Sequence, residues 1–135
     1  TYTKKIQIEA RVLGDLALNH IVPTATKYQS SLLDNIIKME QVLGKEEGDR
    51  ASKENIDTVR TIANSVSEIR RMVDEMVERR KVANRIVEER EKAVAYHDSV
   101  APMLEAIRVH IDKLELIVDN ELWTLPKYRE LMFIV

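Results

Sequence analysis

Residues 59–97 read VRTIANSVSEIRRMVDEMVERRKVANRIVEEREKAVAYH, without a single glycine or proline. One set of positions in this stretch alternates steps of three and four residues, and nine of its twelve members are apolar. The set is Val59, Ile62, Val66, Ile69, Val73, Met76, Arg80, Ala83, Val87, Arg90, Val94 and His97. This spacing is typical of a long helix with a narrow apolar seam, as in a coiled coil.

Two groups of helix-ending residues limit this helix and separate it from its neighbours. Gly44 is placed to end a preceding helix in the left-handed conformation, and Gly48 to turn the chain. Near residues 99–102, Pro102 suits the first turn of a new helix, with Asp98 or Ser99 as its cap. We therefore expect helices over residues 2–43, 52–97 and 100–122, and then a tail over residues 123–135 with a possible short helix at residues 127–132.

Pro23 lies inside the first expected helix. It has no amide donor, and its ring clashes with the carbonyl of Asn19. The sequence leaves open whether Pro23 kinks this helix or breaks it in two.

The expected lengths suggest an architecture. The second helix would span about 70 Å and the third about half of that. We expect an all-α fold in one helical domain over residues 1–135. It would consist of a long antiparallel hairpin, a shorter third helix packed at its base and an apolar C-terminal tail. No alternating pattern predicts a strand.

The composition limits the classes of function. Charged residues make up 33% of the chain, and 21 basic side chains are interleaved with 23 acidic ones. This mixture argues against a nucleic-acid-binding face. The chain has no cysteine, which excludes disulfides and thiolate metal sites and fits a cytoplasmic location. No apolar run reaches the roughly 18 residues that a membrane-spanning helix needs.

The three histidines are candidate metal ligands. They are His20, His97 and His110. A di-iron bundle needs Glu three residues before its histidines, but Ala17, Val94 and Ile107 stand there. No His-Glu-x-x-His motif, nucleophile elbow or phosphate-binding glycine loop occurs. We therefore predict no catalytic, cofactor-binding or metal residues, although a metal site assembled across helices stays conceivable.

The polar residues near Pro23 and on the seam have structural interpretations. Asn19 and His20 are expected to bond carbonyls that Pro23 leaves free, and His97 to lie near a helix C-terminus. Arg80 and Arg90 lie on the apolar seam. Either they extend from its edge into solvent, or they pair with a carboxylate. The candidate carboxylates are Asp15, Glu9 and Glu105.

A third helix of half length would leave residues 24–43 and 52–73 as a two-helix arm. The arm contains the adjacent pairs Leu32-Leu33 and Ile36-Ile37, whose members point about 100° apart. One member of each pair can face the second helix, and the other would lie in water. With Met39 the outer members would make an apolar strip of the kind that marks an interface. We expect self-association there, most simply as a two-fold dimer burying Leu33 and Ile37 or their neighbours. Within a longer protein, the same arm would meet another subunit or the catalytic body.

The tail is the second candidate interface. It concentrates bulky apolar side chains, namely Trp123, Leu125, Tyr128, Leu131, Phe133 and Ile134. Either the tail folds onto the base of the bundle, with Trp123 near residues 10–17, or it docks on another part of a longer protein. The full set of candidate interface residues is Leu33, Ile37, Met39, Trp123, Tyr128 and Phe133.

Unusual residues at both ends carry a family resemblance. They are Ile8-Glu9-Ala10-Arg11, Asn19-His20-Ile21-Val22-Pro23, Tyr28-Gln29, Tyr96, Pro102-Met103 and Leu122-Trp123-Thr124-Leu125-Pro126-Lys127-Tyr128. With them the chain resembles the C-terminal helical region of type III glutamine synthetases. The resemblance covers essentially the whole chain and is weakest at residues 44–49.

This resemblance implies a parent enzyme that ligates ammonia to glutamate with ATP and Mg or Mn, assembled as a large ring. None of the family's nucleotide, glutamate or metal residues maps onto this chain. The expected role is therefore structural, in contacts with the parent's own catalytic domain and with other subunits. A helical pattern without a cap at Thr1 also suggests a piece of a longer protein. The alternative is a free-standing helical-bundle module for protein interaction.

Overall fold

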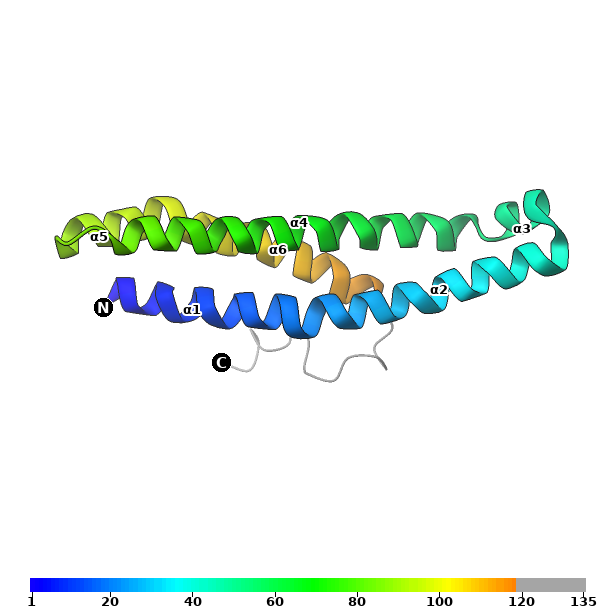
Figure 1. The fold of residues 1–135 in the computed structure, drawn as a ribbon, viewed down its shortest axis with the longest axis horizontal. Coiled ribbons are helices and arrows are strands. Elements are labelled where there is room, and N and C mark those ends of the chain that lie inside the picture. Colours follow the sequence, from blue (N-terminus) through cyan, green and yellow to red (C-terminus); the bar gives the residue numbers. More distant parts are fainter. Residues whose placement is uncertain (119–135) are drawn as a thin grey trace.

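The computed structural model describes residues 1–118, and it is helical throughout this part, without a strand (Figure 1). The elements are α1 (Tyr2–Leu16), η1 (Ala17–Ile21), α2 (Val22–Leu43), α3 (Lys45–Ala51), α4 (Lys53–Asn84), α5 (Glu89–Ala95), η2 (Tyr96–Val100) and α6 (Ala101–Ile117). The segments η1 and η2 are single π-helical turns. The expected all-α class is confirmed.

The first helix runs without interruption through α1, η1 and α2. Its start is capped, because the Thr1 hydroxyl accepts a hydrogen bond from the Lys4 amide at 3.2 Å. The expectation of an uncapped start was therefore wrong.

Pro23 is accommodated by the π turn that precedes it. In η1 the Val22 amide donates to the carbonyl of Ala17, five residues back. This wider turn includes Asn19, whose carbonyl the proline ring would otherwise meet. Pro23 therefore leaves the helix continuous, with only a shallow bend where α2 follows α1 (Figure 1).

Pro102 is accommodated in the same way, so the break expected near it was wrong. The π turn η2 ends at Val100, and the Ala101 amide donates to the carbonyl of Tyr96. The chain is consequently helical from Glu89 to Ile117 through α5, η2 and α6. The third helix thus begins earlier than the expected residue 100.

The chain reverses instead at residues 85–88, inside the expected second helix. Glu88 caps α5, since its carboxylate accepts the amide of Glu91 at 2.7 Å. The reversal folds Tyr96 and Val100 back into the core, where both are fully buried. Burial of these two side chains favours the reversal over a longer straight helix. The seam therefore ends at Ala83, the last of its members that is buried.

Three helices lie side by side over part of the molecule. Figure 1 shows α4 running antiparallel to α1 and α2, while α5 and α6 fold back along α4, and α6 contacts α1 and η1. Beyond the end of α6, the distal half of α2 and the start of α4 continue as a two-helix arm with α3 at its tip. The returning helix is nearly as long as α4, so it covers more than the base.

One cluster of buried apolar side chains fills the bundle. Its largest fully buried members are Tyr96, Ile62, Ile69, Met76, Ile107, Ile111 and Leu114. Most were expected from the spacing of three and four residues in the second and third helices. The hydrophobic effect on this cluster is the main force that holds the three helices together.

The expected turn at residues 44–49 is a short helix, α3. Gly44 has a φ of +86°, which an L-amino acid rarely adopts. Gly48 has a different function from the one expected. A Cβ on Gly48 would lie 2.6 Å from the Cα of Glu40, so α3 and α2 are packed backbone against backbone. Glycine at position 48 permits this close approach.

Several expectations lie outside the described residues. They are the end of the third helix at Leu122, the tail over residues 123–135, the short helix at residues 127–132 and the packing of Trp123 near residues 10–17. The candidate interface residues Tyr128 and Phe133 lie there too.

Candidate interaction surfaces

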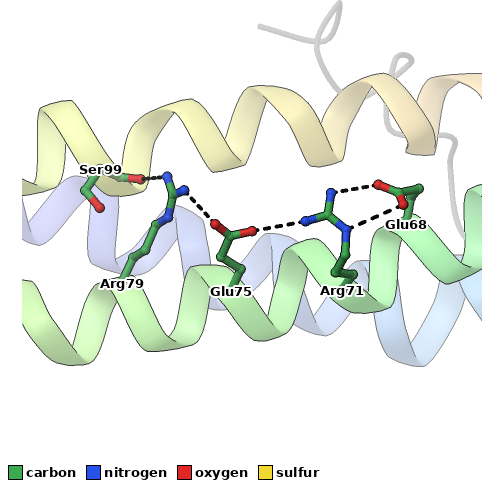
Figure 2. Close-up of polar contacts among 5 residues, drawn as sticks. All are labelled: Glu68, Arg71, Glu75, Arg79 and Ser99. Carbon is green, nitrogen blue, oxygen red and sulfur yellow. Dashed lines mark hydrogen bonds and ion pairs between the residues drawn. The ribbon is translucent and has the colours of Figure 1, made fainter.

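A chain of charged contacts joins α4 to η2 (Figure 2). Arg79 donates one hydrogen bond to the carbonyl of Ser99 at 2.9 Å and another to the Glu75 carboxylate at 2.6 Å. Arg71 in turn bridges Glu75 at 3.2 Å and Glu68 at 2.7 Å. The guanidinium of Arg79 is thus held on one side by Glu75 and directed at the π turn on the other.

The contact between Arg71 and Glu68 shifts the pKa of both groups. The hydrogen bond from Arg71 holds the pKa of Glu68 below its usual range. The same bond raises the pKa of Arg71. Both groups are solvent-exposed, so these ion pairs contribute little to stability individually. Their role is structural, because they orient the Arg79 guanidinium toward the carbonyl of Ser99.

A second polar network fixes the point at which α4 ends. Tyr96, whose ring is fully buried, donates its hydroxyl proton to the side-chain oxygen of Asn84. The Gln7 amide donates to that same oxygen and to the Tyr96 hydroxyl, each at 3.1 Å. These bonds tie α1, the end of α4 and η2 together, and they satisfy the one polar atom of the buried tyrosine.

The histidines lie apart from one another. His20 and His110 are half-buried, whereas His97 is exposed and contacts Asp98 at 3.0 Å. In the described part of the chain, no group of three or more His, Asp or Glu side chains is placed to hold a metal ion. His97 lies in η2 with helix on both sides, so its expected place at a helix C-terminus was wrong.

The polar residues near Pro23 bond differently from the expectation. Asn19 donates to the Asp15 carboxylate at 2.7 Å rather than to a backbone carbonyl. The carbonyl of His20 accepts from the hydroxyl of Thr24 at 2.8 Å. The hydroxyl that bonds a backbone carbonyl of the widened turn therefore belongs to Thr24, the residue after the proline.

The carboxylates proposed as partners of Arg80 and Arg90 are engaged elsewhere. Arg108 contacts Glu105 and lies 3.9 Å from Glu9. Asp15, as described above, accepts from Asn19. Arg80 is half-buried and Arg90 is exposed. Of the two alternatives, pairing with these carboxylates is not seen among the described residues, and the exposed Arg90 agrees with extension into solvent.

The arm carries exposed apolar side chains on α2. Leu33 is 41% exposed and Ile37 is 51% exposed, whereas Ile36 is buried. We call Leu33 and Ile37 the arm strip. Met39 does not belong to it, because two steps along a helix rotate a side chain by about 200°. Met39 is half-buried, and its carbonyl carbon would lie 2.9 Å from a Cβ on Gly48, which places it beneath α3.

Two hydrogen bonds fix the register of the arm. Gln29 donates to the carbonyl of Val59 at 3.0 Å, and Asn55 donates to the side chain of Asn35 at 3.3 Å. In an antiparallel pair these bonds place Leu33 level with about residue 56. That residue is Ile56, which is half-buried and extends the apolar character of the arm onto α4.

A second exposed apolar surface lies at the other end of the molecule, where α5 meets α1. Three adjoining hollows of about 600, 550 and 350 Å³ all have Arg90 in their lining. Tyr2 lines two of them, and Val94 also lines two. The sequence did not identify this surface, because Arg90 and Val94 were assigned to a buried seam. We call Tyr2, Arg90 and Val94 the base surface.

No helix within residues 1–118 has the length and apolar character needed to cross a membrane.

Comparison with known proteins supports the family resemblance that the residue pattern indicates. A family model for the glutamine synthetase C-terminal domain matches residues 1–40. A glutamine synthetase of Bacteroides fragilis (strain YCH46) is 51% identical over 132 residues, which is 98% of this chain and 18% of that protein. A type-3 glutamine synthetase of Dictyostelium discoideum is 23% identical over 133 residues, with the same two coverages. The expected resemblance is thus confirmed, while the chain spans less than a fifth of the length of these relatives.

Proposed function

We propose that this chain, which is similar along nearly its whole length to the C-terminal part of glutamine synthetases, is a non-catalytic helical part of such an enzyme. The coverage carries this proposal, since 98% of the chain matches only 18% of each relative. The parent would be a cytoplasmic ligase that uses ATP and Mg or Mn. The residues for glutamate, nucleotide and metal would lie in the remainder of its polypeptide.

The polar side chains of this domain support a structural role. Arg79 is bonded to a backbone carbonyl, and Gln7, Asn84 and Tyr96 bond one another across three elements. Side chains that bond across elements in this way hold helices in place. The partners we propose are therefore other parts of the same enzyme, namely its catalytic domain and other subunits of its ring.

The arm strip supports contact between identical subunits. A two-fold interface needs a surface that is complementary to itself. Asp34 and Lys38 are exposed next to the arm strip on α2. If two copies of α2 cross antiparallel at about residue 36, Lys38 of one copy meets Asp34 of the other while Ile37 becomes buried. This surface is therefore complementary to itself in both charge and apolar character.

Calorimetry on the isolated chain tests the non-catalytic role. We expect no heat of binding for ATP with Mg²⁺ or for glutamate, and no glutamine formation from ammonia. The full-length parent, titrated in parallel, serves as the positive control. Stoichiometric binding of ATP by the isolated chain at micromolar affinity would overturn the proposal.

The alternative, a free-standing interaction module, differs from the proposed function in the reading frame that it requires. The proposed function requires the reading frame to continue for several hundred residues upstream of Thr1. A start codon just before Thr1 would favour the module instead.

A further inference from the structure

The base surface has the composition of a binding site for another protein surface. Val94 is 54% exposed and Tyr2 is 41% exposed. The smallest of the three hollows is lined by Tyr2, Ala93 and Val94, with Arg90, His97 and Asp98 as its charged or polar members. The other two hollows also carry the carboxylates of Glu88, Glu89 and Glu91. Tyrosine and arginine are among the residues in which binding energy is most often concentrated.

Arg90 is the polar element of this surface. It lines all three hollows and forms no ion pair with any described residue. The neighbouring Glu88 carboxylate is already engaged as the cap of α5. A guanidinium in this position can donate two parallel hydrogen bonds to a carboxylate of a partner.

The comparisons favour one partner, since this chain matches only 18% of each relative and most of the proposed parent therefore lies outside it. Thr1 and Tyr2 line the largest hollow together with Glu88 and Arg90, on the opposite side of it from α5. Under the proposed function this domain is the C-terminal part of the polypeptide, so the catalytic body is connected to it through the start of α1, which lines this hollow. A covalent connection that arrives beside a surface gives the attached body a high effective concentration there, so a small interface is sufficient.

We propose that the base surface binds the catalytic body of the same polypeptide, through an apolar patch that carries a carboxylate for Arg90. This inference rests on the proposed function. It assigns different partners to the two ends of the bundle: the base surface contacts its own chain, and the arm strip contacts another copy.

Hydrogen exchange on the full-length polypeptide tests this proposal. We expect the amides of residues 86–98 to exchange at least about tenfold more slowly in the full-length protein than in the isolated chain. Val94→Asp should remove this difference, since it places a second charge in the apolar patch. The matched control is Val109→Asp on α6, at a position 64% exposed, and it should leave the difference intact.

Two outcomes would overturn the proposal. One is equal exchange of residues 86–98 in the two proteins. The other is protection in the isolated chain that grows with its concentration, because a second copy would then occupy the base surface. Both are distinct from failure of the proposed function, which shows as ATP binding by the isolated chain in calorimetry.

Discussion

Arg79 shows how a single side chain can stabilise a helix at a point that a proline weakens. Pro102 brings no amide donor to the turn that contains Ser99, and the π turn redistributes the bonds around it. Arg79 supplies a charged donor to the carbonyl of Ser99 from a different helix. One bond therefore supports the π turn and also fixes η2 against α4.

Arg79→Met should test the strength of this bond, because methionine keeps the aliphatic stem and removes the donor. Because the Arg79 side chain is 36% exposed, its guanidinium is expected to contribute only about 1–2 kcal/mol to the free energy of unfolding. The measurement is urea unfolding followed by circular dichroism. Arg70→Met is the control, since Arg70 is exposed on the same helix and should change stability by less than about 0.5 kcal/mol. Equal losses for the two variants would show that the bond to Ser99 contributes nothing.

Two helical glycines differ in the space around them, and substitution by alanine should have opposite effects. A Cβ on Gly14 would make ordinary contacts, 3.6 Å from the Met76 side chain and 3.7 Å from that of Val73. Gly14→Ala should therefore stabilise the fold by about 0.5–1 kcal/mol. Gly48→Ala should destabilise the fold, because its Cβ would lie 2.6 Å from the Glu40 backbone and force α3 off α2. Thermal unfolding of both variants gives the comparison, and a stabilising Gly48→Ala would contradict the close packing of α3.

Among the elements, the sequence predicted α4 best over residues 59–83, where apolar spacing alone identified the buried side chains. It failed at residues 85–88, because this reversal contains neither glycine nor proline and depends on a Glu88 cap and the bond between Asn84 and Tyr96. It failed in the opposite sense at Pro102, because a π turn can absorb a proline that local rules interpret as a helix start. Both errors arise from tertiary contacts that no local pattern reports.

The same errors determined which surface could be predicted. Leu33 and Ile37 were identified because adjacent apolar residues on one helix cannot both face a single partner helix. The base surface was not identified, since its residues belong to the seam only if α4 continues past Asn84. A surface created by the end of a helix depends on knowing where the helix ends.

The arm strip gives the prediction at the scale of an element. The isolated chain should form a dimer at tens of micromolar, and Ile37→Glu should shift it to a monomer, since a carboxylate would then be buried at the two-fold contact. Light scattering after gel filtration measures the mass. Val42→Glu is the matched control on the same helix, because Val42 is 81% exposed and points away from the arm strip. A monomer for the unchanged sequence would remove the support for this contact.

At the scale of the whole molecule, the two surfaces lie at opposite ends of a rod, with α5 and Thr1 at one end and α3 near the other (Figure 1). Sites this far apart without shared partners are expected to respond to substitution independently. In the full-length protein, Ile37→Glu should therefore reduce the size of the assembly while residues 86–98 remain protected from exchange. Val94→Asp should do the reverse. If Ile37→Glu also abolished the protection at residues 86–98, docking of the base surface would depend on assembly through the arm, and the assignment of separate partners to the two ends would be wrong.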